Sequence, residues 1–434
     1  MTSIEGDPGL PKLSITASKP RLLDRLGPGL ITGAADDDPS GIATYSQAGA
    51  QFGFAITWTM LFSYPLMAGI QEISARIGRT TGQGIAGNLR SHFPPWILNL
   101  TVGLLFLTNT INIGADLGAM GDAVRLLVGG STAIYVVLFA FISAALQILV
   151  KYSRYVSVLK WLTLSLFAYF GTVLFAKIPL DEFARGFFIP TLSADKAFWA
   201  TVVAVLGTTI SPYLFFWQAS QEVEDERASA KRKPLVDAPE QAEAAIGRIR
   251  VDTYAGMGFS TLVALAIMVT TAATLHANGT TDIQTSSQAA EALRPVAGRF
   301  AFTIFALGVI GTGFLAIPVL AGSAAYALGE ARQWPIGLAR KPRKAKAFYA
   351  TIAIATLVGT AIDFSPIDPI KALFWSAVIN GVVAAPVMAM MMLMSARADI
   401  MKENVVVGVL RWIGWVSTAI MAVAVIGMIA TSIM

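Results

Sequence analysis

The sequence predicts an all-α polytopic membrane protein with about eleven transmembrane helices, arranged as two inverted five-helix repeats. Of the 434 residues, 55% are hydrophobic and only 14% are charged. Apolar runs near twenty residues long recur along the chain, and an α-helix needs about that length to cross a bilayer. Two of these runs, the first and the sixth, are interrupted by proline and polar residues. Five spans per repeat is an odd number, so the repeats would have opposite orientations in the membrane.

The expected spans in chain order are 26–53, 55–78, 95–124, 132–150, 155–178, 196–222, 249–275, 296–328, 345–362, 370–396 and 405–433. Residues 26–178 would form the first repeat and residues 196–396 the second, with the last span outside both. A polar segment, 1–25, precedes the first span and has no apolar core of the kind found in a cleavable signal peptide. The longest polar interruption, about 221–248, is expected to be an interfacial helix, a linker beside a gate or a solvated loop.

The basic residues predict the orientation of the chain. Most of the 32 Lys and Arg residues lie in the N-terminal segment and in the loops after even-numbered spans, which predicts a cytoplasmic N-terminus in the plasma (inner) membrane. The densest basic run, 340–346, falls on the same side. The net charge of +5 therefore indicates membrane topology and not a nucleic-acid surface, and the bilayer is the partner it predicts.

Several chemistries are excluded by what the chain lacks. It has no cysteine and only two histidines, His92 and His276, both in predicted loops, so disulfides, thiolate metal sites and most imidazole chemistry are not expected. Paired aspartates could serve an intramembrane enzyme as acid and base. The sequence contains no HExxH motif and no Ser/His pairing, however, and we predict that the protein is not an enzyme.

The first break, GAADDDPSGI at 33–42, places Asp36, Asp37 and Asp38 before Pro39 within an apolar span. A carboxylate at the bilayer centre costs about 2.5 to 3.5 kcal/mol, so three in a row predict a functional site. Because an α-helix turns by about 100° per residue, the three side chains cannot share one face. We expect Asp38 to bind a ligand, and Asp36 and Asp37 to pair with a buried donor or face a wet vestibule.

The second break, GTTISPYLFFWQ at 207–218, contains Thr208, Ser211 and Pro212. Proline removes a backbone donor and disfavours the α conformation in the residue before it, so Asp38 and Ser211 are expected at the ends of half-helices. A half-helix that ends inside the bilayer presents free carbonyls with partial negative charge, which together with a carboxylate make a cation site. The candidate ligands are the Asp38 carboxylate, carbonyls near Ser40 and Thr208, and the hydroxyls of Thr208 and Ser211. This all-oxygen set suits magnesium, calcium or manganese.

Together, DDDPSGIATYSQAGAQFGF and GTTISPYLFFWQASQEVE resemble the Nramp family of divalent metal transporters, and more closely its Nramp-related magnesium transporter branch. The resemblance extends over almost all of spans 1 to 10, including QEISARIGR (71–79) and NIGADLGAMG (112–121). It implies a LeuT-like fold with broken helices 1 and 6. Typical members have Asp-Pro-Gly-Asn in helix 1 and Ala-Thr-Val-Met-Pro-His in helix 6. Here the aspartate and both prolines are kept, but the other positions carry Gly41, Thr208, Ser211 and Tyr213.

These departures predict a change of substrate. Without the methionine sulfur the site loses its soft ligand, and without the asparagine it gains room beside Gly41. A wider, harder site suits Mg²⁺, which dehydrates reluctantly and keeps several waters. We therefore expect a transporter that imports Mg²⁺, with Mn²⁺ as a second substrate, and that needs no cofactor and no protein partner.

Proton coupling is expected to be weak or absent. The histidine positions of the family fall on Tyr213 and Gln218, and of two acidic positions in helix 3 only Asp116 remains, because Ala119 occupies the other. The membrane potential alone would drive import. The alternatives are a proton-coupled Mn²⁺/Fe²⁺ symporter of the ordinary Nramp kind and a transporter of amino acids or other organic solutes on the same architecture.

Further polar residues within spans are candidates for the pathway or for helix packing. Asn109, Asn112 and Asp116 recur on one face of the third span, so they border the cavity or hydrogen-bond a neighbouring helix. Asn380, beside Gly381, is expected to approach the ion from the tenth span or to pack against another helix. Gln218 and Glu222 would line an acidic exit or sit on a solvated helix end.

Overall fold

The structure is a computed structural model that describes residues 28–150, 165–229, 231–364 and 368–433. Within these residues every regular element is helical, as the sequence predicts. Eight helical segments are long and apolar enough to span a membrane, and the pair formed by 39–56 and 58–81, bent by 110°, supplies up to one more. The fifth expected span, 155–178, lies partly outside the described residues. In the part of this span that the structure describes, the α-helix is α8 (Phe167–Phe175).

The first repeat begins with a broken helix. Its halves are α1 (Pro28–Asp36) and α2 (Pro39–Phe52), and the short η2 (Gly53–Ile56) leads into α3 (Trp58–Thr81). Two further long helices are α5 (Pro95–Val128) and α6 (Thr132–Leu149). The interruption at Asp37 and Asp38 therefore lies where the proline and the charges predict it.

The second repeat also begins with a broken helix, formed by α10 (Lys196–Thr209) and α11 (Pro212–Arg227). The remaining helices of this repeat are α12 (Ala242–Thr274), α15 (Ala301–Arg332), α16 (Lys346–Asp363) and α17 (Pro369–Ser395). The last helix, α19 (Gly408–Ile433), packs against α3, α10 and α17. The break between α10 and α11 confirms the second interruption.

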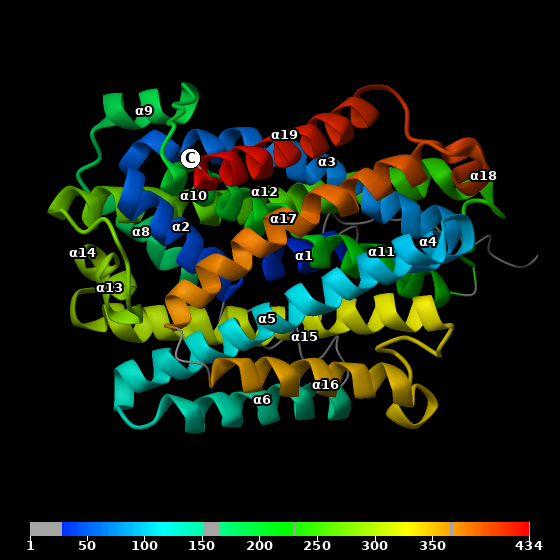
Figure 1. Cartoon of the computed structure of the whole chain (residues 1–434), viewed down its shortest axis with the longest axis horizontal. Helices are drawn as coiled ribbons and strands as arrows, with labels where there is room; N and C mark the ends of the chain where they lie inside the picture. The colour runs from blue at the N-terminus through cyan, green and yellow to red at the C-terminus, as the bar shows by residue number, and fades with distance from the viewer. Residues whose placement is uncertain (1–27, 151–164, 230, 365–367, 434) are drawn as a thin grey trace, which may run out of the picture.

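Hydropathy alone misplaced several boundaries. The polar stretch expected at 221–248 is shorter than predicted, because α11 continues to Arg227 and α12 begins at Ala242. In the described part of the chain, five short helices lie between the expected spans or at their ends. They are α4 (Ile85–His92), α9 (Leu180–Phe188), α13 (Ser286–Glu291), α14 (Arg294–Ala297) and α18 (Ala398–Met401). His92 therefore ends a helix and does not lie in a loop. Figure 1 shows α9, α13 and α14 at one end of the bundle and α4 and α18 at the other.

Close helix packing holds the second break against α17. A Cβ atom added at Gly207 would lie 2.1 Å from the Ala377 carbonyl oxygen and 2.4 Å from the Gly381 nitrogen, so only glycine permits this approach of α10 and α17. The neighbouring residue Asn380 is thereby brought to the side of α10 just before its break. The close approach of α10 and α17 therefore determines which polar residues lie next to the second break.

Candidate metal site at the two helix breaks

The first break is organised around Asp38, which caps the start of α2. Its backbone is extended (φ −70°, ψ 171°). Its Oδ1 accepts hydrogen bonds from the Gly41 amide at 2.7 Å and from the Ser40 hydroxyl at 2.6 Å. Aspartate is a favoured N-cap residue, and proline is favoured at the first helical position because its missing donor is not needed there. The sequence Asp-Pro-Ser-Gly therefore ends one half-helix and starts the next.

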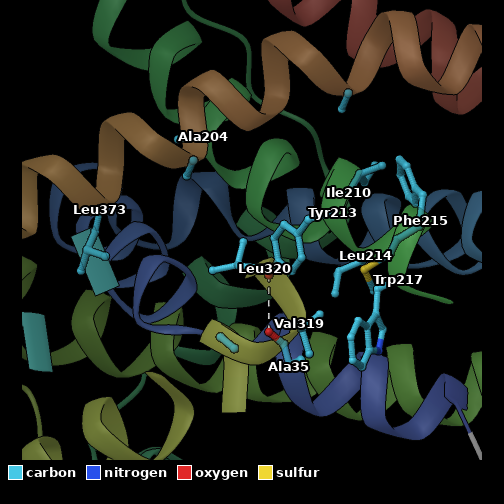
Figure 2. Close-up of a cluster of buried hydrophobic side chains, with 14 of the residues drawn as sticks. Ala35, Ala204, Ile210, Tyr213, Leu214, Phe215, Trp217, Val319, Leu320 and Leu373 are labelled. Atoms are coloured by element: carbon cyan, nitrogen blue, oxygen red, sulfur yellow. Dashed lines mark hydrogen bonds between the residues drawn. The ribbon is translucent and has the colours of Figure 1, made fainter. Parts of the chain in front are cut away.

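The second oxygen of Asp38 is reached from two other helices. The Tyr213 hydroxyl, at the start of α11, donates to Oδ2 at 3.1 Å, and the Asn112 amide of α5 donates at 3.4 Å. Figure 2 shows Tyr213 pointing toward Ala35, whose carbonyl lies 3.4 Å from the same hydroxyl. Asp38 thus joins both broken helices to α5. Four donors surround its carboxylate in this conformation.

The second break is closed by a serine. The Ser211 hydroxyl lies 2.7 Å from the Gly207 carbonyl and 2.8 Å from the Thr208 carbonyl, and its one hydrogen is shared between them. The last carbonyls of a helix lack intrahelical partners, and a serine just beyond the end can satisfy them. In this arrangement the Ser211 hydroxyl serves the end of α10, so its predicted role as a metal ligand remains a prediction.

Oxygen atoms of the two breaks converge on Gly41, and the Tyr45 ring also packs against it, 3.3 Å from where a Cβ atom would lie. A Cβ atom at this position would lie 3.3 Å from the Asp36 carbonyl oxygen and 3.4 Å from Thr208 Oγ1. The carboxylate of Asp38, the hydroxyl of Thr208 and this carbonyl therefore lie around one residue that has no side chain. The Asp36 carbonyl is a candidate ligand that sequence reasoning missed, although its place at the last residue of α1 is a signal that could have identified it.

Asp36 and Asp37 have surroundings different from those of Asp38. The Ser260 hydroxyl of α12 lies 2.5 Å from Asp36 Oδ2 and 3.1 Å from Asp37 Oδ1, while Asp36 Oδ1 has no hydrogen-bond partner within the part of the chain that the structure describes. In the described part of the chain, no group of three or more His, Cys, Asp or Glu residues has a geometry that could hold a metal ion. The three adjacent carboxylates therefore do not form one metal-binding cluster. Since Asp37 and Asp38 lie between α1 and α2, the break itself separates Asp38 from the other two.

The polar residues of α5 and α17 have different surroundings. Some hydrogen-bond a neighbouring helix, and others lie at the candidate metal site or are buried without a partner among the described residues. Asn109 donates to the Leu320 carbonyl and to the Ser323 hydroxyl, both of α15 and both at 2.8 Å, so it joins two helices. Asn112 contacts Asp38 instead. Asp116 and Asn380 are buried, and among the described residues none of their side-chain polar atoms has a hydrogen-bond partner. Such groups are costly unless a ligand or water satisfies them.

Further along α11, Gln218 and Glu222 are buried and contact polar residues of neighbouring helices. The Gln218 amide donates to the Thr253 hydroxyl at 2.8 Å and accepts from Gln71 at 2.6 Å. Glu222 is fully buried in an ion pair with Arg248. The expectation of a solvated helix end is therefore wrong for Glu222, and in this conformation its charge does not line an open acidic exit. These contacts tie α11 to α3 and α12.

The site is occluded in this conformation. Asp38 and Ser211 are each 1% exposed and Thr208 is 2% exposed. On the side where α1 begins, the Gly29 amide donates to the Asp252 carboxylate of α12 at 2.7 Å, which holds the start of the half-helix against the bundle. An ion at Asp38 would need these contacts to open on one side at a time, which is the structural requirement of alternating access.

Two broken helices that face each other at the middle of a helical membrane bundle define a transporter of the inverted-repeat class. Solved structures agree on this fold. A manganese transporter from Eremococcus coleocola superposes with a TM-score of 0.71 at 16% identity, covering 92% of this chain and 84% of that one. MhsT, solved with L-phenylalanine, superposes with a TM-score of 0.61 at 12% identity, covering 93% of this chain and 97% of that one.

Sequence comparison identifies the family. Residues 29–431 match the Nramp family, described as natural resistance-associated macrophage protein-like. The chain therefore belongs to the Nramp family, and it is a multi-pass membrane transporter and not an enzyme. It is 27% identical over 419 residues to the divalent metal cation transporter MntH of Klebsiella pneumoniae, covering 94% of each chain. The corresponding protein of Yersinia enterocolitica is 29% identical over 297 residues, which are 67% of this chain and 69% of that protein.

Proposed function

We propose that the protein imports divalent metal cations by alternating access, with Mg²⁺ as its main substrate and Mn²⁺ as a second one. The observation that carries the proposal is the chemistry around Asp38. One carboxylate, the Asp36 carbonyl and the Thr208 hydroxyl all lie close to Gly41, and these are hard oxygen ligands. Magnesium is commonly held by one or two carboxylates while it retains several waters. The relatives named as divalent metal cation transporters support the broader class of substrate.

The donors around Asp38 also favour a hydrated ion. Asn112 and Tyr213 both lie within hydrogen-bond distance of Oδ2. The Asn112 amide can turn to hydrogen-bond the waters of an incoming ion when the ion takes the carboxylate oxygen, whereas the Tyr213 phenol must give up its hydrogen bond to that oxygen. Ser211 adds another hydroxyl beside the break, where typical family members have a methionine sulfur. The ligands named here are all oxygen atoms, which softer ions prefer less than sulfur.

The membrane potential is the proposed driving force. Moving a divalent cation inward is worth roughly 4.6 kcal/mol per 100 mV, at about 2.3 kcal/mol for each charge. Since 1.4 kcal/mol corresponds to about a tenfold concentration ratio, this energy supports more than a thousandfold accumulation. The chain has no imidazole in either broken helix, because His92 ends α4 and His276 begins the short η5 (His276–Asn278).

A second candidate is a proton-coupled Mn²⁺/Fe²⁺ symporter of the ordinary Nramp kind. The observation that favours it is Asp116, which is buried and whose two carboxylate oxygens have no hydrogen-bond partner among the described residues. A buried carboxylate without a partner is suited to carry a proton. The two candidates differ in whether proton uptake accompanies metal uptake, which a flux measurement separates.

The test is metal uptake into proteoliposomes that contain the purified protein, an internal magnesium dye and a potassium-valinomycin potential. Asp38→Asn keeps a helix-capping side chain but removes the charge, and it should abolish uptake. Asp195→Asn is the matched control, because Asp195 caps α10 in the same way, through the Ala197 amide at 3.0 Å, at an exposed position.

Potential-dependent Mg²⁺ uptake by the wild type and by Asp195→Asn, with none by Asp38→Asn, would support the proposal. Uptake of Mn²⁺ with accompanying protons and no response to Mg²⁺ would favour the symporter. Undiminished uptake by Asp38→Asn would move the site elsewhere.

A further inference from the structure

An open cavity of about 280 Å³ lies at the end of the bundle that contains α4, which the charge pattern predicts to be cytoplasmic. Three separate parts of the chain line it: α4, the end of α11 and the segment that follows α15. Figure 1 shows α4, α11 and the end of α15 toward this same end of the molecule. Each part contributes one arginine to the lining, namely Arg90, Arg227 and Arg340. This cavity is separate from the Asp38 site.

The three arginines are exposed, and within the described residues none of them forms a close ion pair. Among the described residues, no carboxylate lies within 4.0 Å of these three guanidinium groups in an ion pair, and Arg227 donates to the Gly82 carbonyl at 3.3 Å. The cavity also contains one carboxylate, that of Glu330. It accepts from the Gly84 amide at 3.0 Å and the Gly87 amide at 2.9 Å, at the start of α4. Three cations therefore face one carboxylate whose oxygens are already engaged.

The chemistry of the cavity suits a phosphate group. Guanidinium groups present several donors in a plane and bind phosphate oxygens in pairs, so three of them around one hollow favour a polyvalent anion over a carboxylate. Trp334 also lines the cavity and is 37% exposed. Tryptophan is enriched at membrane interfaces, and basic pockets at the cytoplasmic ends of transmembrane helices bind anionic headgroups. The basic segment 340–346 begins at the rim and adds to the positive potential.

We propose that this cavity binds a phosphate-bearing anion, which bridges Arg90, Arg227 and Arg340. The anion is the headgroup of an anionic phospholipid or a soluble phosphate compound, and both present the same chemistry to the arginines. Arg227 is the last residue of α11, and the first residues of the same half-helix, Pro212 and Tyr213, border the metal site. An anion bound in this cavity would therefore link the end of α11 to α4 and to the segment after α15. It would thereby change how readily α11 moves during transport.

Binding can be tested without any transported metal. The full-length protein in neutral detergent is titrated with tripolyphosphate by isothermal calorimetry in metal-free buffer. Retention of phosphatidylglycerol over phosphatidylcholine is measured by native mass spectrometry after purification from mixed nanodiscs. The test variant is Arg90→Gln with Arg340→Gln. The control is Arg343→Gln, which removes one charge from the basic segment, as Arg340→Gln alone does, at a residue that does not line the cavity.

The wild type and Arg343→Gln should bind at least one of the two probes with affinities within about twofold of each other, while the double variant binds at least tenfold more weakly. Binding of tripolyphosphate alone would identify a soluble ligand, and selective retention of phosphatidylglycerol would identify the lipid. The single variant Arg340→Gln, at an exposed loop position, replaces the double variant if the latter does not fold. The proposal is overturned if neither probe binds, or if the arginine variants bind as Arg343→Gln does. Since no divalent metal is present, failure here leaves the metal-transport proposal unaffected.

Discussion

Replacing Tyr213 with phenylalanine should tighten metal binding at Asp38. In the occluded conformation the Tyr213 hydroxyl donates to Asp38 Oδ2 at 3.1 Å, and an ion that takes this oxygen must displace that hydrogen bond. Tyr213 is 1% exposed, and phenylalanine fills nearly the same volume, so the substitution leaves no large cavity. The main change is the loss of a hydrogen bond that competes with the ion for Asp38 Oδ2.

The size of the effect follows from the charge of the acceptor. A hydrogen bond to a charged group contributes about 1.5 to 3 kcal/mol. The 3.1 Å distance is long for an O–H donor, which places this bond near the lower value. Because 1.4 kcal/mol corresponds to a factor of ten, the Kd for Mg²⁺ should fall about tenfold in the variant. The remaining donor to Oδ2, the Asn112 amide at 3.4 Å, is too distant to replace it.

The assay is calorimetric titration of the detergent-purified protein with Mg²⁺ and with Mn²⁺. Tyr326→Phe is the matched control, because Tyr326 is equally buried and its hydroxyl donates to Glu224 at 2.6 Å, away from Asp38. The control should leave both Kd values unchanged, and Asp38→Asn should show no binding. Weaker binding by Tyr213→Phe would refute the reasoning, because it would mean that the phenol stabilises the bound ion more than the empty carboxylate.

Three further outcomes are expected. Ser211→Met combined with Gly41→Asn and Thr208→Ala should shift the order of uptake rates toward Mn²⁺ and Cd²⁺, and an unchanged order would show that these positions do not set selectivity. Gly381→Val should lower the melting temperature in detergent, because a Cβ atom there would lie 2.7 Å from the Val203 carbonyl oxygen and overpacking costs about 1–3 kcal/mol. Acidifying the outside of proteoliposomes at fixed voltage should not drive metal accumulation. Proton uptake in proportion to metal flux would contradict the uncoupled mechanism.

The breaks could be predicted because their causes are local. Pro39 and Pro212 each remove a backbone donor, and the carboxylates before Pro39 are too costly to place in a packed apolar helix without a function. The structure places both interruptions at these residues. The helix ends beyond the apolar runs were less predictable. The last turns of α11 are charged, and Glu226 there forms an ion pair with Arg79 at 3.2 Å. A hydropathy pattern takes no account of such ion pairs.

The partners of the site residues could not be predicted, because they come from distant parts of the chain. Nothing in the sequence around the first break indicates that Ser260 of α12 lies beside Asp36 and Asp37, or that Asn112 reaches Asp38 while Asn109 bonds to α15. The three-residue spacing puts the two asparagines on one face of α5, but it does not decide which neighbour each one meets. That choice depends on how α5 crosses the other helices.

The different surroundings of the adjacent aspartates argue for separate roles. Asp38 has four donors from three helices, so its carboxylate can exchange hydrogen bonds for an ion and be stabilised in either state. Asp36 and Asp37 lie beside a single hydroxyl, that of Ser260, and a hydroxyl can donate only one hydrogen. The pair is therefore less well satisfied than Asp38 and depends on the position of α12. Since α12 also holds the start of α1 through Asp252, separation of α1 from α12 would change the environment of Asp36 and Asp37 while leaving the Asp38 cap on α2 intact.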